Sequence, residues 1–209
     1  MSDSLSLSAA GSSALDEETA RAELYGLLAQ LYYARPNPET LAALRVAVTE
    51  APIEGGFLQE PWQQLVGTAR ALDDVAIAAE FDRLFGGVGK PEVFLYGSHY
   101  LSGFLNEKPL VRLRSDLAAL GLARGEAMPE TEDHVAYLCE VMRYLIAGDD
   151  MVVCNLTAQR KFFVTHLQPW ILPLCDALQG QSAAHFYAAL AHFTRAFVAI
   201  EVQGFDMLD

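Results

Sequence analysis

The sequence predicts an all-α fold, a single helical domain of about eight or more helices, and three observations lead to that prediction. Apolar residues recur at spacings of three and four along most of the chain, which is the period of one helical face. Capping residues and prolines separate these stretches. No window alternates polar and apolar residues between hairpin turns, as the strands of a sheet would. A chain of 209 residues suits one fairly large domain or two small ones.

The first half of the chain divides into a tail and four helices. Residues 1–14 are expected to form a disordered tail, and the helical domain covers residues 15–209. A first helix runs from about Asp16 to Ala34 and ends before Pro36, which cannot continue it. The next three helices are expected to begin at residues that favour a helix start: Asn37, Pro61 and Asp73.

A Gly-rich break over residues 86–97 follows the fourth helix, and it could be a hinge between two lobes. It carries the apolar run Val93-Phe-Leu-Tyr96, which must either pack against the body or contact a ligand. Large aromatic side chains bracket the break: Phe81, Phe85, Phe94, Tyr96, Tyr100 and Phe104. Any one of these rings is expected in the core, but as a group they surround a loop.

The second half of the chain is expected to form further helices, whose ends are marked by capping residues, glycine and proline. Their expected starts are Ser98, Pro109, the central stretch described next, Asp149 or Asp150, and Ser182. Gly121 follows the end of one helix, in the position that favours glycine. Pro169 interrupts another helix, and the last one ends near Gln203 with an apolar seam at spacings of three and four.

The stretch Met128–Met142 is the most unusual part of the sequence. It is expected to begin a buried helix, with Thr131 as a plausible N-cap and three acids in the first turn: Glu130, Glu132 and Asp133. His134 lies where the apolar face begins. Glu130, one turn before His134, is expected to raise the pKa of the imidazole and to keep a charge at a groove. The alternative for each acid alone is simple stabilisation of the helix dipole.

Composition and charge exclude several classes of partner. The formal net charge of −13 argues against nucleic acid and against an anionic membrane surface, which both require basic residues. It favours a basic partner, although acidity also keeps a chain with 52% hydrophobic residues in solution. No apolar run is long enough for a membrane span, and the N-terminus lacks the features of a secretory signal. We therefore expect a cytoplasmic protein.

Motifs for catalysis fail on inspection, so we expect no enzyme, no cofactor and no metal. The fragment Gly86–Lys90 resembles part of a phosphate-binding loop, but Leu84 stands where a glycine is needed and Pro91 where Ser or Thr is needed. The five histidines lack the spacings of known metal sites. Three cysteines, widely separated, are expected to be free and buried. A helical-bundle enzyme with a metal or nucleotide site remains the alternative, as does a helical adaptor that binds a folded partner through its last helix.

Several sequence blocks, in order along the chain, match those of a known family. They are Phe81-Asp-Arg-Leu-Phe-Gly-Gly87, Tyr96-Gly-Ser-His-Tyr100, Val111-Arg-Leu-Arg114, Leu120-Gly-Leu122 and Glu130-Thr-Glu-Asp-His134. Gln159, Phe163, His166, Leu167 and Trp170 fit the family's downstream helix. Over about residues 20–200 the chain resembles the TorD/DmsD chaperones, which are related to the NarJ chaperones. Thr131 departs from the proline that the family often has at that position.

The resemblance implies a function that the composition also suits. Chaperones of this family bind the twin-arginine leader and the catalytic subunit of a molybdopterin enzyme until its cofactor is inserted. The acids and rings would match the leader's arginines and its apolar run. The residues expected at the peptide site are Asp133, His134, Glu130, Tyr96, Ser98, Tyr100, Phe81 and Phe85. Formate dehydrogenase is the favoured client, and the chain is expected to be a monomer or a domain-swapped homodimer, with a hinge at 86–97 or 121–129.

Overall fold

The fold was described from a computed structural model of the chain. It describes residues 6–49, 58–86, 90–105, 108–125 and 128–207, with side chains from residue 17 onward. The helices are α1 (Ser6–Tyr33), α2 (Pro38–Val46), α3 (Gln59–Ala71), α4 (Asp74–Phe85), α5 (Gly97–Ser102), α6 (Lys108–Ala119), α7 (Val135–Ala147), α8 (Leu156–Phe162), the π-helix η1 (Phe163–Leu167), α9 (Gln168–Gln179) and α10 (Phe186–Asp206). Within the described ranges no strand forms, and the predicted all-α class is confirmed.

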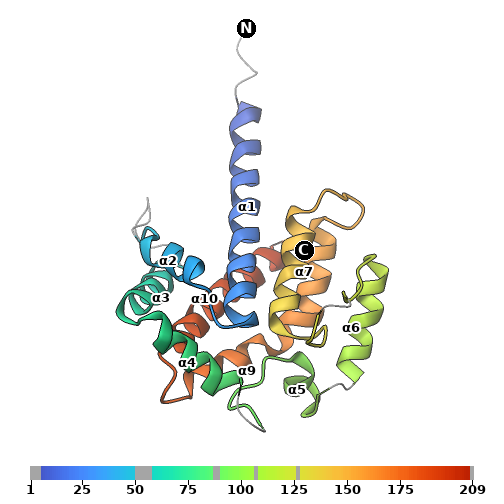
Figure 1. Cartoon of the computed structure of the whole chain (residues 1–209). Coiled ribbons are helices and arrows are strands. Elements are labelled where there is room, and N and C mark those ends of the chain that lie inside the picture. Colours follow the sequence, from blue (N-terminus) through green and yellow to red (C-terminus); the bar gives the residue numbers. More distant parts are fainter. Residues whose placement is uncertain (1–5, 50–57, 87–89, 106–107, 126–127, 208–209) are drawn as a thin grey trace.

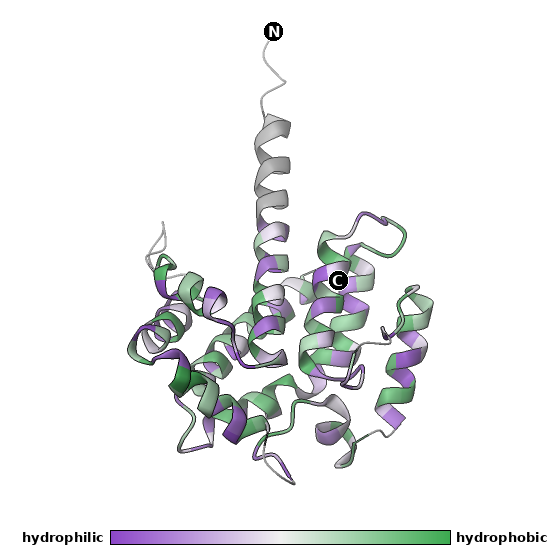
Figure 2. Ribbon diagram, viewed as in Figure 1, coloured by the Kyte–Doolittle hydropathy of each residue, from purple (hydrophilic) through white to green (hydrophobic). Residues whose placement is uncertain are grey.

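One apolar core joins the helices. In Figure 1, α1 runs through the middle of the molecule, with α2, α3 and α4 to its left and α5 and α6 to its right. The closest packing is between α1 and α7, and between α10 and α9. Buried apolar residues from α1 to α10 belong to a single cluster, which includes residues on both sides of the 86–97 break. The described helices therefore form a single domain. In Figure 2, hydrophobic and hydrophilic residues are interleaved along most of the helices.

Local sequence signals set several helix boundaries as expected. The side chain of Asn37 accepts a hydrogen bond from the Thr40 backbone at 2.7 Å and caps α2. Asp73 caps α4 in the same way through the backbone of Ala76. Gly121 lies beyond α6 with φ of 72°, a left-handed conformation that favours glycine.

Other boundaries differ from the sequence-based expectation. α1 begins at Ser6 rather than near Asp16, since the Ser- and Ala-rich segment contains no residue that firmly stops a helix. Of the tail expected over residues 1–14, residues 1–5 lie outside the described part of the chain, and residues 6–14 belong to α1. α8 begins after Asn155, whose side chain accepts from Ala158 at 3.0 Å, and not at Asp149 or Asp150.

The start of α10 depends on a contact from another helix. The buried carboxylate of Glu80, on α4, accepts hydrogen bonds from the backbone N–H groups of His185, Phe186 and Tyr187 at 2.9, 3.2 and 2.8 Å. A carboxylate at a helix N-terminus satisfies N–H groups that lack partners within the helix. The helix therefore begins at Phe186 rather than at Ser182.

A π-helical turn over Phe163–Leu167 precedes Pro169. Proline offers no N–H to the preceding turn, so the interruption predicted at this position takes the form of one wide turn. The Trp170 indole N–H donates a hydrogen bond to the His166 carbonyl at 2.6 Å, so a side chain also binds a carbonyl group of this turn. The sequence indicated a break here, but not its type.

The three cysteines are free and buried, as expected: Cys139, Cys154 and Cys175. Four of the five seam residues of α10 are also buried, because Phe186, Leu190, Phe193 and Phe197 are each at most 1% exposed, while Ile200 is half-buried. That seam is therefore occupied by the protein's own core. It is not available to a folded partner, which removes the basis for the adaptor alternative.

We expect Glu80→Ala to lower the free energy of unfolding by roughly 2–4 kcal/mol, because three buried N–H groups lose a charged acceptor. Glu39→Ala is the matched control, since Glu39 is exposed in the first turn of α2, and its change should stay below about 1 kcal/mol. Urea unfolding followed by circular dichroism measures both. Equal effects would show that Glu80 does not set the start of α10.

Candidate functional site

Residues 130–134, which we call the acidic clasp, pair with the segment before α5. The Gly97 N–H donates to the Asp133 carbonyl at 3.0 Å, and the Val135 N–H donates to the Leu95 carbonyl at 2.8 Å. These bonds form an isolated antiparallel bridge between Tyr96 and His134. Asp133 lies in a turn that is closed by a hydrogen bond from the His134 N–H to the Thr131 carbonyl at 3.0 Å, and its side chain faces other surroundings than that of His134.

Each acid of the clasp contacts a different element. Glu130 accepts from the Tyr96 hydroxyl, and Glu132 binds the Arg114 guanidinium of α6 through two contacts of 2.9 Å. Asp133 accepts from the Ser98 backbone N–H at 2.8 Å and from the Thr131 hydroxyl at 2.6 Å. The acids therefore hold α5 and α6 beside α7 and do not occupy the first turn of α7.

His134, and not Thr131, is the N-cap of α7, which corrects the expected helix start. Its Nδ1 accepts a hydrogen bond from the Ala136 N–H at 3.2 Å, so that nitrogen carries no proton. Burial lowers the pKa of His134 to about 4, outweighing the opposite effect of the Glu130 and Asp133 carboxylates. The expected rise of the pKa was wrong, because the side chain is only 3% exposed. His134 is neutral near pH 7.

Three tyrosines surround the His134 imidazole. Ring centroids of Tyr96, Tyr137 and Tyr33 lie 5.1, 5.7 and 6.3 Å from it. Tyr33 is 42% exposed, so this aromatic group reaches the surface. Tyr33 and Tyr137 were missed by sequence reasoning, because they lie at the end of α1 and within α7, where an aromatic residue is usually part of the core.

On its other side, the clasp presents Asp133 to a cavity of about 330 Å³. Its lining is mainly apolar and comes from α5, α6, α7, η1 and α9: Gly97, Leu101, Pro109, Arg112, Leu113, Asp133, Leu138, Thr165, His166, Pro169 and Trp170. Gly97 is needed at this wall, because a Cβ atom there would lie 2.9 Å from the Trp170 indole nitrogen. Tyr100 stacks on Trp170 with ring centroids 5.6 Å apart, so it supports the wall from behind.

The rings predicted to form one cluster are divided among several places. Phe81 and Phe85 pack on Tyr187 of α10, away from the clasp. Phe94 stacks on His99 at 4.0 Å, while Phe104 is 71% exposed. The structure thus brings Glu130, Tyr96 and His134 together, places Asp133, Ser98 and Tyr100 near the cavity, and leaves Phe81 and Phe85 separate. As a peptide-binding set, these eight residues stay a prediction.

Two residues with basic side chains that line the cavity were not singled out for the site by the sequence. Arg112 lies on α6, and His166, on η1, lies 2.8 Å from Asp116 of α6 between Nε2 and Oδ2. Burial lowers the pKa of His166, although Asp116 opposes this effect. The available signal was a match of His166 to the family's downstream helix.

Metal-binding clusters and membrane-spanning helices are absent from the described residues. No group of three or more His, Cys, Asp or Glu side chains there could hold a metal ion. No described helix combines the length and the apolar character that a bilayer span requires. Most of the Gly86–Lys90 fragment lies outside the described residues, so the structure adds nothing to the sequence argument about phosphate.

Comparison with known proteins identifies the family. A family model described as "Nitrate reductase delta subunit" matches residues 56–176, more than half of the chain. The chain belongs to this family, which includes the TorD and NarJ chaperones of redox enzyme maturation, so the resemblance seen in the sequence is confirmed. Members named in the comparisons are chaperones, and the chain is therefore a chaperone and not an enzyme.

Individual relatives agree with this assignment. The chaperone protein TorD of Vibrio cholerae is 26% identical over 204 residues, covering 90% of this chain and 93% of the relative. TorD of Shewanella loihica is 25% identical over 207 residues, covering 88% and 92%. A crystal structure from Archaeoglobus fulgidus, of a protein to which redox enzyme maturation has been ascribed, has a TM-score of 0.57 at 17% identity. The structural alignment covers 86% of this chain and 92% of the Archaeoglobus fulgidus chain, so the two proteins share a fold.

Acidification should destabilise the protein through His134. Its pKa is lower in the folded protein than in the unfolded chain, so the unfolded chain binds more protons between pH 6.5 and 4. Stability is therefore lost as the pH falls through this window. Between pH 7 and 4.5 the wild type should lose about 2–3 kcal/mol more unfolding free energy than His134→Asn, which keeps an N-cap acceptor. Urea titrations at both pH values measure this difference, and parallel losses would contradict the assignment.

Gly97→Ala should lower the free energy of unfolding by roughly 1–3 kcal/mol, because the added Cβ pushes against Trp170. Gly67→Ala in α3 is the control, since its Cβ would meet nothing within 4 Å. That variant should gain up to about 1 kcal/mol of stability from helix propensity. Thermal unfolding of the two variants provides the comparison. An unchanged stability of Gly97→Ala would show that Trp170 can shift to accommodate the added Cβ atom.

Proposed function

We propose that this chaperone acts in the cytoplasm on the catalytic subunit of a molybdopterin oxidoreductase. It binds the twin-arginine leader of that subunit and holds the subunit until its cofactor is inserted, before export. Formate dehydrogenase is the favoured client, because the Gly97-Ser-His-Tyr-Leu101 block and Asn106-Glu-Lys-Pro-Leu110 look more like that branch of the family. The resemblance is compatible with a monomer or a domain-swapped homodimer.

The observation that carries the proposal is the apolar cavity beside Asp133. Apolar side chains remain exposed around it: Leu101 at its lining is 43% exposed, and Phe104 and Val111 on the neighbouring segments are 71% and 66% exposed. Exposed apolar side chains beside a cavity are typical of a site for an apolar partner. The hydrophobic run of a leader has this chemistry.

The acidic character of the chain supports the basic part of the same ligand. A net charge of −13 attracts a cationic peptide, and Glu130 accepts a hydrogen bond from Tyr96 of the aromatic group, whose Tyr33 is exposed. Aromatic faces and carboxylates together suit a guanidinium group. The neutral His134 inside that group adds no positive charge that would repel an arginine.

Two of the expected site residues also stabilise helix N-termini, and this affects the choice of test variants. Asp133 caps α5 and His134 caps α7, so alanine at either position would weaken the fold as well as any binding. Asp133→Asn removes the charge and keeps an acceptor for the Ser98 N–H. It is therefore the better probe of the carboxylate's role.

A synthetic twin-arginine leader of a formate dehydrogenase should bind saturably, and Trp170 offers an intrinsic reporter. Trp62→Phe leaves Trp170, which lines the cavity, as the only tryptophan. Asp133→Asn should weaken binding about 3- to 10-fold and reduce its dependence on salt, while Asp206→Asn on the exposed end of α10 should not.

Fluorescence titration at low and high salt measures these affinities. No saturable binding to wild-type protein by any leader of the molybdoenzyme class would overturn the proposed function. Equal affinities for Asp133→Asn and Asp206→Asn would remove the Asp133 charge from the site and leave leader binding itself intact.

A further inference from the structure

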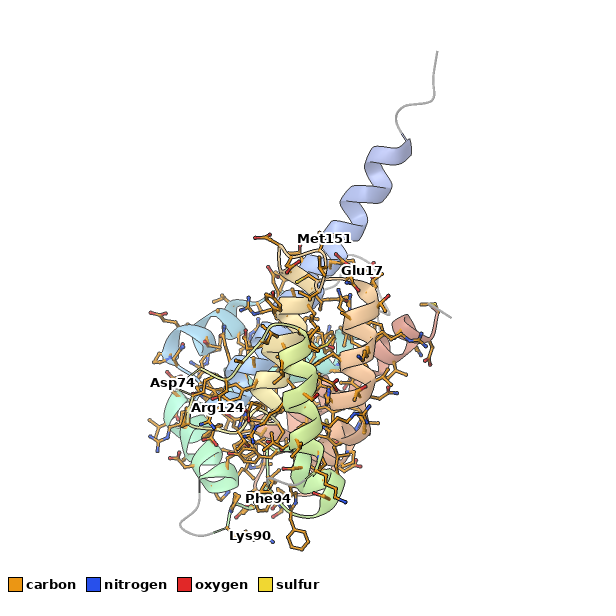
Figure 3. All side chains as sticks on the ribbon, turned by 90° about the vertical axis from the view of Figure 1, so that its right-hand side faces the viewer. Glu17, Asp74, Lys90, Phe94, Arg124 and Met151 are labelled. Carbon is orange, nitrogen blue, oxygen red and sulfur yellow. The ribbon has the colours of Figure 1, made fainter. Side chains whose placement is uncertain are left out.

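A second cavity lies along the same helix as the first. It has a volume of about 430 Å³ and is lined by α6, the segment before α8, α8 and η1. Its lining residues are Asp116, Ala119, Leu120, Val152, Val153, Asn155, Thr157, Ala158, Lys161, Phe162 and His166. Both cavities have α6 on one side and η1 on the other, and they share His166. Together they are here called the α6 groove. In Figure 3, α6 crosses the front of the molecule from the end that carries Phe94 toward the end that carries Met151.

The two cavities repeat with a fixed spacing on the α6 wall. The first is lined by Pro109, Arg112 and Leu113, and the second by Asp116, Ala119 and Leu120. Each member of the second set lies seven residues after its counterpart in the first. Seven residues are two helical turns, a rise of about 10.5 Å.

The opposite wall repeats with the same spacing, in the reverse direction. Ala158 and Phe162 line the second cavity, and Thr165 and Pro169, seven residues later in each case, line the first. The walls therefore run antiparallel, and the second wall includes the π-helical turn η1 between the two cavities. The seven-residue spacing on the α6 wall matches side chains that project seven residues apart from one face of a third helix.

A polar contact divides the α6 groove. His166 Nε2 lies 2.8 Å from Asp116 Oδ2, and Arg112 lies 4.0 Å from the same carboxylate. The charged residues that line the two cavities are Arg112, Asp116, Asp133 and Lys161, two of each sign. The α6 groove is thus close to neutral in a strongly acidic protein, which suits an uncharged apolar segment whose basic residues lie elsewhere.

Exposed apolar side chains occur at both cavities. Leu101 at the first is 43% exposed, and Val152 at the second is 84% exposed. A ligand that filled both cavities would bury both residues.

We propose that the α6 groove binds the apolar run of the leader as a helix, with two apolar side chains seven residues apart, one in each cavity. The proposal rests on the proposed function, since it names the part of the leader that this groove takes. The second cavity thereby becomes a specificity site, because only leaders with apolar residues at both positions fill it.

Substitution on α6 separates this proposal from the proposed function. Ala119→Trp fills the second cavity from an exposed position, and Ala118→Trp places the same ring on the preceding residue, which is also exposed but lines neither cavity. We expect Ala119→Trp to weaken leader binding about 10-fold or more, as losing one buried apolar side chain does. Ala118→Trp should bind like the wild type, and circular dichroism should show that both variants are folded.

The spacing is tested with leader peptides in which each apolar residue is replaced in turn by alanine. Leu101→Trp perturbs the first cavity in the same way as Ala119→Trp perturbs the second. The leader position that loses its effect in Leu101→Trp should lie seven residues from the one that loses its effect in Ala119→Trp. Another spacing, or equal binding by Ala119→Trp and Ala118→Trp, would overturn the two-cavity proposal. Failure of the wild type to bind any leader would instead overturn the proposed function.

Discussion

The short antiparallel pairing between residues 95–97 and 133–135 is the constraint on which the rest of the site depends. Two backbone hydrogen bonds fix the N-termini of α5 and α7 against each other. The turn over residues 131–134 directs Asp133 and His134 to different sides. One side becomes a cavity wall with Trp170, and the other becomes an aromatic group with Tyr33. In a helix over the same residues, as the sequence suggested, the two side chains would point about 100° apart.

The acidic clasp shows how one sequence block can serve several helices. Glu130, Glu132 and Asp133 contact Tyr96, Arg114 and the Ser98 N–H, so a block that looks like the first turn of one helix connects three. Such residues are constrained by structure even where they also meet a ligand. Loss of binding after mutation within this block therefore has two possible physical origins, which isosteric substitutions separate.

Local signals predicted the fold class and many boundaries. Asn37, Asp73 and Gly121 act within a few residues of their own positions, and the structure agrees with what their types indicate. Glu80 and Asp133 act at helix N-termini far away in sequence, and nothing near them reveals which N–H groups they will meet. The pKa of His134 was mispredicted for a related reason, because charge neighbours are visible in sequence and the extent of burial is not. The cavities likewise arise where α6 meets η1, two elements separated by about 50 residues, as the Asp116–His166 contact shows.

The buried thiols have a consequence for how this protein can be handled. Desolvation raises the pKa of Cys139 and Cys175 well above the ordinary value, and Cys154 is also buried. Since the thiolate is the reactive form, Cys139 and Cys175 should react slowly with oxidants and alkylating agents while the protein is folded. A single cysteine introduced on the surface of α6 would then be the fastest-reacting thiol, so fluorophores or spin labels could be attached there without first removing the native cysteines.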